Sequence, residues 1–331
     1  MQRHILFLLV FIVLAATKGF SQDPVFSQYY SAPLQLNPAF AGNGYAPQLA
    51  INYRNQWPTL GAYVTYAASY DQYIDHLNSG VGLMVLTDDA GQGLIKTNKI
   101  AGFFSYRLQI TEGLFAKIGA EVAWVQSRYN WNAFQFADQL DKFTGPVSPG
   151  GTPFPTGEER PQNLNNAYGD IAAGMLLYNK TFYGGFSIKH INRPNESILL
   201  TNQNLFGGLP YRFTIHGGAQ IELIEGNKRK PAAFISPNVM FVRQGDFGQT
   251  NVGAYFGYGA LFVGGWYRHA RTNPDAVIAL VGVETGIFKI GYSYDFTVSK
   301  LGNTGGSHEI SLRIKPKEPK QDFNDCFQLF R

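Results

Sequence analysis

The stretch Phe288–Phe296 reads FKIGYSYDF, and the character of its side chains alternates. Every even position is aromatic or aliphatic, whereas every odd position is charged, small or hydroxylated. Successive side chains of a β-strand point to opposite faces, so this stretch has one apolar face and one polar face. Residues 212–223 and 114–124 repeat the pattern, with Ile215 and Val122 on their apolar faces. The alternation predicts amphipathic strands, which occur both in membrane barrels and in soluble sandwiches.

The number and length of such segments favour the barrel. About fourteen candidate strands follow one another, most of them about 9–14 residues long, whereas a soluble strand usually has five or six residues. About 9–11 tilted residues carry a strand across a bilayer. The candidate strands are 48–56, 62–73, 79–87, 95–109, 114–130, 167–178, 182–192, 211–224, 232–243, 249–258, 260–269, 276–285, 287–297 and 307–315.

The connections between these strands alternate between tight turns and longer loops. Connections near 112 and 180 are tight, whereas the loops at 131–166 and 193–210 are long. Outer-membrane barrels have short periplasmic turns and long external loops, and a sandwich has no reason to segregate them. We therefore predict an all-β fold, a transmembrane outer-membrane β-barrel of about 14 antiparallel strands over residues 47–315, with both termini periplasmic.

Two further expectations follow from a barrel. Arginine at the lipid-facing positions Ile290 and Ile215 should impair assembly, and arginine at the lumenal positions Ser293 and Thr214 should be tolerated better. Aromatic residues near strand ends should form the interfacial girdles. The predicted girdle residues are Tyr29, Tyr30, Trp57, Tyr66, Trp131, Tyr211, Trp266 and Tyr267.

The N-terminus predicts export. Residues 1–21 are interpreted as a signal peptide cleaved after Ser21, because the apolar core Ile5–Ala16 suits export and is too short to span a membrane. Charged residues and aromatic residues each make up 15% of the chain, which suits a large surface facing outer-membrane lipids. The single cysteine, Cys326, allows no intramolecular disulfide. A net charge of +4 is too small to indicate a nucleic-acid partner.

No motif for catalysis, for a cofactor or for a metal stands out. The six histidines are scattered singly, without the spacing of a metal site. Some outer-membrane barrels carry catalytic groups at the external rim, where His190 or His269 beside a serine would be the candidate. We predict a protein that is not an enzyme and has no small-molecule substrate. We also expect no cluster of lumenal charges of the kind that selects a solute.

Several blocks resemble the PorP/SprF family, outer-membrane proteins of the type IX secretion and gliding-motility system of the Bacteroidetes. The blocks are Asp23–Tyr30 (DPVFSQYY), Leu36–Gly42 (LNPAFAG), Tyr53–Trp57 (YRNQW), Gly306–Leu312 (GSHEISL) and the tail that holds Cys326. The family's tail usually has proline after the cysteine, whereas here Phe327 follows Cys326. The resemblance implies either a core component associated with the periplasmic ring proteins or a partner for export and surface retention of a secreted type B C-terminal-domain protein. A passive outer-membrane channel or transporter is the alternative.

The residues themselves suggest where partners bind. The segment 22–46, punctuated by prolines, is expected to be irregular and to serve as a periplasmic plug or a docking surface. The long loop is expected to pack its aromatic end either into the barrel mouth or against a partner, and Phe134, Phe136 and Asp138 are the predicted partner contacts. Residues 316–331 are interpreted as a periplasmic tail. Closure of the barrel should also bring Glu309 beside Arg54.

Overall fold

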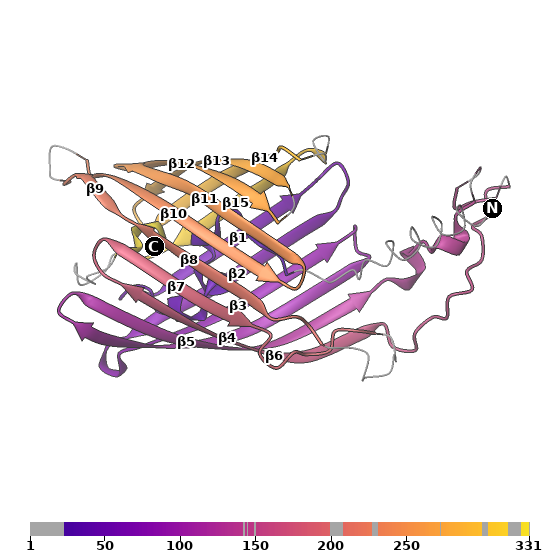
Figure 1. Cartoon of the computed structure of the whole chain (residues 1–331), viewed down its shortest axis with the longest axis horizontal. Helices are drawn as coiled ribbons and strands as arrows, with labels where there is room; N and C mark the ends of the chain where they lie inside the picture. Colours follow the sequence, from indigo (N-terminus) through magenta and orange to yellow (C-terminus); the bar gives the residue numbers. More distant parts are fainter. Residues whose placement is uncertain are drawn as a thin grey trace, which may run out of the picture.

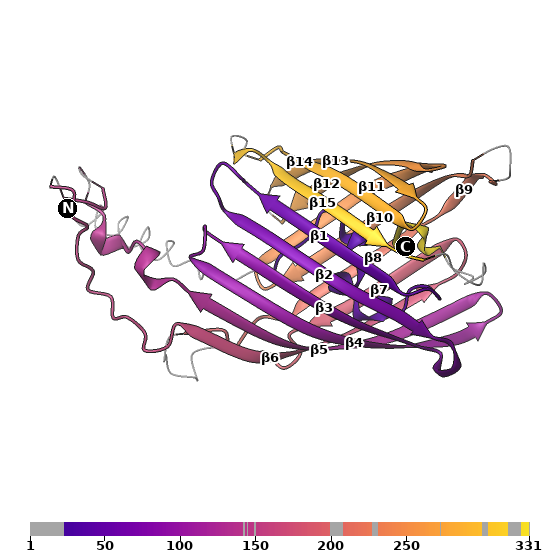
Figure 2. The same cartoon turned by 180° about the vertical axis from the view of Figure 1, so that it is seen from behind.

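Fourteen membrane-crossing strands close into an antiparallel barrel in the computed structural model (Figures 1 and 2). The structure describes residues 23–141, 143, 145–148, 150–198, 208–226, 231–271, 273–299, 304–316 and 326–330. The signal peptide predicted for residues 1–21 lies outside this range. The strands are β1 (Gln48–Gln56), β2 (Tyr63–Ile74), β3 (Ser79–Ala90), β4 (Ile95–Thr111), β5 (Leu114–Tyr129), β6 (Asn165–Tyr178), β7 (Phe182–Lys189), β8 (Arg212–Ala219), β9 (Ile221–Ile224), β10 (Ala233–Gln244), β11 (Phe247–Tyr258), β12 (Leu261–Ala270), β13 (Pro274–Thr285), β14 (Phe288–Thr297) and β15 (Ser307–Ile314).

The first and last strands close the barrel. β1 pairs with β15, and Arg54 lies directly opposite Glu309 in this register. β8 and β9 both pair with β10, so the two short elements form one crossing, interrupted at Gln220. Each of the fourteen crossings has a neighbour on both sides, so the sheet closes, although the short β9 pairs with β10 alone among the described residues. The predicted barrel of about 14 strands is confirmed.

The two faces of the wall follow the predicted alternation. Ile290 and Ile215 point outward and are exposed, whereas Ser293 and Asp295 point into the lumen and are buried. The alternation fails at the end of β8, where Ala219 is buried and the predicted lumenal residue Glu222 is exposed. Pairing with β10 keeps one register from Gly218 to Glu222 and shifts only between Glu222 and Ile224, so the failure begins before the shift.

The connections separate into two ends of the barrel. The turn end carries tight connections such as 112–113 and 179–181, and the loop end carries the two longest, 130–164 and 190–211. Two connections depart from this rule, 245–246 at the loop end, which is short, and 225–232 at the turn end, which is longer. The longest connection, residues 130–164, is named the arm here, and it extends away from the barrel in Figure 1. Its bends include the 3-10 helices η4 (Trp131–Ala133) and η5 (Ala137–Gln139). Among the described residues, no helix is long and apolar enough to span a membrane.

The predicted aromatic girdle is wrong in part. Tyr66 and Tyr267 are exposed on the outer face, in agreement with the prediction. Tyr29, Tyr30 and Trp266 are buried instead, and the rings of Tyr30 and Trp266 stack with their centroids 5.5 Å apart. Sequence proximity to a strand end does not reveal which face of the wall an aromatic ring occupies.

Candidate functional site

The lumen is occupied by the chain's own N-terminal segment, defined here as residues 23–46. It contains η1 (Tyr29–Ser31), α2 (Pro33–Leu36) and η2 (Pro38–Phe40). Pro33 and Pro38 begin their helices, where a missing N–H costs nothing. The Asn37 side chain accepts a hydrogen bond from the Ala39 N–H and caps η2. Nearly all side chains of this segment are buried, so it packs against the wall along its length.

A network of buried charges joins the N-terminal segment to the closing strands, and it is named the ionic cluster. The Arg54 guanidinium lies 2.9 Å from a Glu309 oxygen and 3.0 Å from an Asp295 oxygen. The Ser27 hydroxyl donates to Asp295 at 2.6 Å, and the Ser27 backbone N–H donates to Glu309 at 2.8 Å. Arg268 adds a second contact to Asp295 at 2.9 Å. Buried charges persist only when they are paired and hydrogen-bonded, as these are.

A second group of charges lies elsewhere in the lumen. The Lys99 ammonium is 2.5 Å from Glu121 and 3.8 Å from Asp170, and the Lys189 ammonium is 3.6 Å from Glu121. Charges therefore do gather in the lumen, but in mutual pairs, and the expectation that none of them selects a solute stays a prediction. The expected Arg54–Glu309 pair is confirmed. The four residues of the second group lie on the consecutive strands β4, β5, β6 and β7, so neighbouring strands bring them together, whereas Arg54 and Glu309 meet only because the barrel closes. The lumenal charges pair with one another rather than line an open path.

Glycines of the wall allow the N-terminal segment to come close. A Cβ added to Gly119 would lie 2.3 Å from the Ala39 nitrogen, and one at Gly174 would lie 2.0 Å from the Asn37 side-chain oxygen. At Gly80 the added carbon would lie 2.0 Å from the Ala41 carbonyl oxygen. Real Cβ contacts are essentially never this short, so the wall and the segment Asn37–Gly42 are built to fit each other.

The start of the N-terminal segment is held by a charged group near the loop end. His190 contacts Asp23 through Nε2 at 3.0 Å and Asp170 through Nδ1 at 3.1 Å, and Arg212 contacts Asp23 at 3.1 Å. Burial acts to lower the pKa of His190, but the neighbouring carboxylates outweigh it and raise this pKa to about 9. Burial acts to raise the pKa of Asp23, but His190 and Arg212 hold it well below its usual range. Both groups are therefore charged at neutral pH, and the pair holds this end of the segment.

The C-terminal tail also reaches into the barrel. Phe327 and Phe330 of η7 (Phe327–Phe330) are fully buried, and Cys326 is buried beside them. The ring of Phe330 stacks on Phe40 of the N-terminal segment at 4.5 Å and meets Tyr183 of the wall at 5.2 Å. Phe327 approaches Phe40 at 5.5 Å. The tail thus contributes apolar side chains to the lumenal core, which nothing in the sequence pattern indicated.

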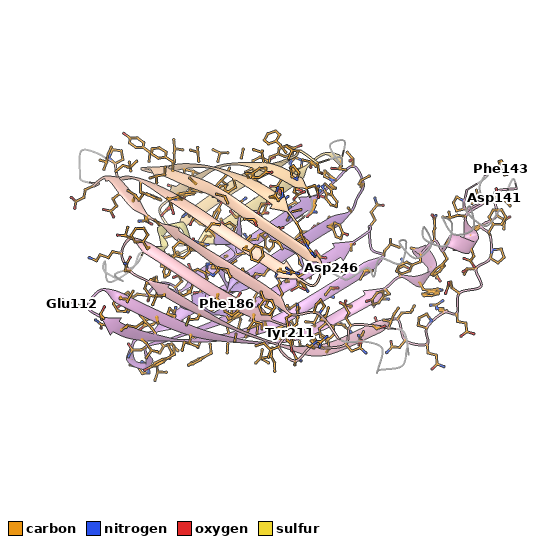
Figure 3. All side chains as sticks on the ribbon, viewed as in Figure 1. Glu112, Asp141, Phe143, Phe186, Tyr211 and Asp246 are labelled. Atoms are coloured by element: carbon orange, nitrogen blue, oxygen red, sulfur yellow. The ribbon has the colours of Figure 1, made fainter. Side chains whose placement is uncertain are left out.

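The arm carries the predicted partner contacts outside the barrel. The rings of Phe134 and Phe136 pack with Trp131 and are half-buried within the arm. The Asp138 carboxylate accepts hydrogen bonds from the Gly157 N–H at 2.6 Å and the Thr156 hydroxyl at 3.0 Å, which tie the outgoing and returning halves together. The Gly157 hydrogen bond also lowers the pKa of Asp138. Figure 3 places Asp141 and Phe143 at the tip, beyond the loop end and away from Glu112 at the turn end.

The two histidines considered for rim catalysis do not contact a serine through the hydrogen bonds described. His190 bonds carboxylates, as described above, and the His269 ring bonds the Tyr267 hydroxyl at 3.1 Å. Within the described part of the chain, no group of three or more His, Cys, Asp or Glu residues could hold a metal ion.

A closed barrel with an apolar outer face and a polar, occupied lumen defines an outer-membrane β-barrel protein. A family model, described as the type IX secretion system membrane protein PorP/SprF, matches residues 18–314. The chain belongs to this family, and membership implies a membrane component of the type IX secretion system in the outer membrane. A search among curated proteins found no match.

Solved structures resemble the barrel at low identity. The Acinetobacter baumannii outer membrane protein Omp33 is 11% identical with a TM-score of 0.44, and the match covers 83% of this chain and 99% of Omp33. A TodX ΔS2S3 mutant monoaromatic hydrocarbon channel is 12% identical with a TM-score of 0.43, and the match covers 85% of this chain and 92% of TodX. Likenesses this remote say nothing about function.

Proposed function

We propose that the protein is a non-enzymatic, plugged barrel of the type IX secretion system that holds a secreted protein at the cell surface through its arm. In this proposal the turn end, where β15 ends, faces the periplasm, because outer-membrane barrels have short periplasmic turns and long external loops. Asp23 lies at the loop end, so the expected periplasmic N-terminus is not part of the proposal. The arm then stands outside the cell, and the secreted partner is a type B C-terminal-domain protein.

The proposal rests on the position of the arm and on its exposed aromatic residues. It projects beyond the loop end, and Phe143 near its tip is 94% exposed (Figure 3). Exposed and half-buried aromatic rings are typical of protein-binding surfaces. The C-terminal rings of Phe327 and Phe330 are buried, so they are not available to a periplasmic partner. This difference favours the arm over the tail as the docking site.

The filled lumen counts against a passive channel. A barrel of about fourteen strands is wide enough to leave a lumen unless something fills it. The N-terminal segment makes hydrogen bonds to at least three parts of the wall, through Ser27, Asn37 and Gly42. We propose that this segment is a permanent plug, so that the barrel acts as a scaffold and not as a diffusion pore.

The test compares two arm variants with a control. The variant Phe134→Ala/Phe136→Ala/Asp138→Ala removes the proposed contacts, and deletion of residues 141–153 removes the tip, with Asp141 and Phe143, while keeping Thr156, Gly157 and Arg160. Either should release the secreted partner into the medium while barrel levels stay normal. Asp246→Ala, an exposed change elsewhere at the loop end (Figure 3), should leave the partner on the surface. Unchanged surface retention in both arm variants, with periplasmic ring proteins still co-purifying, would favour the ring-associated core role instead.

A further inference from the structure

A cleft of about 540 Å³ opens at the base of the arm, where β4, β5 and β6 reach the loop end. Three cationic side chains line it, from Lys96 on β4, Arg128 on β5 and Arg160 on the returning half of the arm. Asn165 and Trp131 also line the cleft. No acidic side chain belongs to the lining. We call this feature the basic cleft.

The cations of the basic cleft form no ion pair with the described residues. Lys96 and Arg128 lie directly opposite each other in the β4–β5 ladder, an arrangement in which like charges repel. Over the described ranges, none of the three cations makes an ion pair within 4.0 Å. Asp89 is opposite Lys96 on β3 and accepts a hydrogen bond from the Gly93 N–H at 2.6 Å, and its carboxylate makes no ion pair with Lys96 within 4.0 Å. Opposed cations around one cavity favour an anionic ligand.

The cleft lies on the outer face of the wall, not in the lumen. On β5, Glu121, Ala123 and Val125 are buried on the lumenal side, so Arg128 is in phase with the exposed residues Val122 and Trp124. Register places Lys96, Arg128 and Asn165 in one row across three neighbouring strands. This row belongs to the surface that faces lipid lower down the barrel.

The height of the row matches lipid headgroups. Ile100 and Trp124 are the outermost exposed apolar pair on β4 and β5, and Lys96 and Arg128 lie four residues beyond them. Four residues span about 13 Å along a strand, which is about 9 Å along the membrane normal for strands tilted by about 45°. The headgroup layer adds about 5–7.5 Å on each side of the hydrocarbon, so the row lies at its outer edge. Asn98 and Gln126, the pair between the two rows, are already polar.

We propose that the basic cleft binds the phosphate group of a lipid headgroup in the outer leaflet. Guanidinium groups bind phosphate oxygens through paired, charge-assisted hydrogen bonds, and an ammonium adds a point charge. The Asn165 amide can donate a further hydrogen bond. Because Arg160 belongs to the arm and Lys96 and Arg128 to the wall, a bound phosphate links the two and fixes the base of the arm.

The experiment uses the full-length barrel in neutral detergent, with dioctanoyl phosphatidic acid as the lipid probe and inorganic phosphate as the soluble probe. Native mass spectrometry should detect one retained phosphatidic acid, and each of Arg128→Gln and Arg160→Gln should weaken its apparent affinity about tenfold. Arg271→Gln, which removes an exposed cation paired with Asp246 at the same end, should leave affinity unchanged. Retention of heat-modifiable mobility in each variant establishes that the barrel is folded.

Two results would overturn the proposal. The first is equal retention of phosphatidic acid by wild type and by a folded Lys96→Gln/Arg128→Gln/Arg160→Gln variant, which would show that the lipid does not bind in the basic cleft. Displacement of the lipid by inorganic phosphate at the same concentration would assign the cleft to a soluble anion and not to a headgroup. Loss of partner retention has no bearing on either result, because the arm tip and the cleft are changed separately.

Discussion

At the residue scale, the fit between Gly119 and the N-terminal segment gives the sharpest prediction. A Cβ at this position would collide with the backbone of Pro38 and Ala39, which cannot move aside as a flexible side chain can. Gly119→Ala should therefore lower the free energy of unfolding by about 1–3 kcal/mol, the usual cost of overpacking. Urea titration of the barrel in bilayers measures this change in the free energy of unfolding. Gly102→Ala, where an added Cβ meets nothing within 4 Å, should change stability by about 0.5 kcal/mol or less.

The outer face gives a second prediction at this scale. Ile215 points to lipid between Phe186 and Phe241 on the neighbouring strands, all three exposed. Ile215→Arg should cost about 2–4 kcal/mol if it lies near the bilayer midplane, and Gln126→Arg, beyond the apolar band, about 0–1 kcal/mol. The fraction of folded protein on unheated gels measures the effect of each of the two substitutions. Equal damage from the two changes would mean that the apolar band is wrongly placed.

The expected tolerance of arginine in the lumen has to be revised. Ser293 is fully buried, and its hydroxyl accepts a hydrogen bond from the Gln28 side chain at 3.0 Å. A lumenal position would accept arginine easily only if water filled the lumen. Because the N-terminal segment fills this part of it, Ser293→Arg should damage assembly as well.

At the element scale, the strands could be read from the sequence because their signal is local. Alternation and turn residues set each strand, and β1 begins and ends at the predicted residues. The interruption between β8 and β9 was missed because the alternation of residues 212–223 continues through it. The location of the N-terminal segment in the lumen could not be predicted from the sequence. Ser27 and Glu309 are 282 residues apart, so no local periodicity could show that they are in contact. Its prolines predicted an irregular segment but not its surroundings.

The burial of the C-terminal tail leads to an element-scale prediction. Phe327 and Phe330 anchor the tail in the lumenal core, and truncation of a buried Phe typically costs about 3–5 kcal/mol. Phe327→Ala/Phe330→Ala should therefore undock the tail and leave the strands in place. Cys326 is buried and is the chain's single cysteine, so its rate of maleimide labelling reports undocking directly. Labelling should be slow in wild type and fast in the variant. Phe143→Ala, at the exposed arm tip, should leave it slow.

At the scale of the whole molecule, three chain segments share one enclosed space. The wall supplies paired charges, the N-terminal segment supplies backbone groups and rings, and the tail supplies Phe327 and Phe330. Lys117 of β5 donates to the carbonyls of Ala41 and Gly42 at 2.7 and 3.0 Å. Hydrogen bonds to a charged donor each contribute about 1.5–3 kcal/mol. Such contacts on several strands make spontaneous release of the N-terminal segment unfavourable.

The last prediction concerns conductance. Wild-type protein in a planar bilayer should pass little steady current, because the N-terminal segment occupies the lumen. Deletion of residues 23–46 should produce a large, steady conductance, provided that the variant still shows heat-modifiable mobility. Gly119→Ala keeps every strand and loosens the segment, so it should produce brief openings even if the deletion fails to fold. A steady wild-type current would contradict a permanent plug and favour the channel alternative. Wild-type closure together with openings in Gly119→Ala would tie that closure to the contact between Ala39 and the wall.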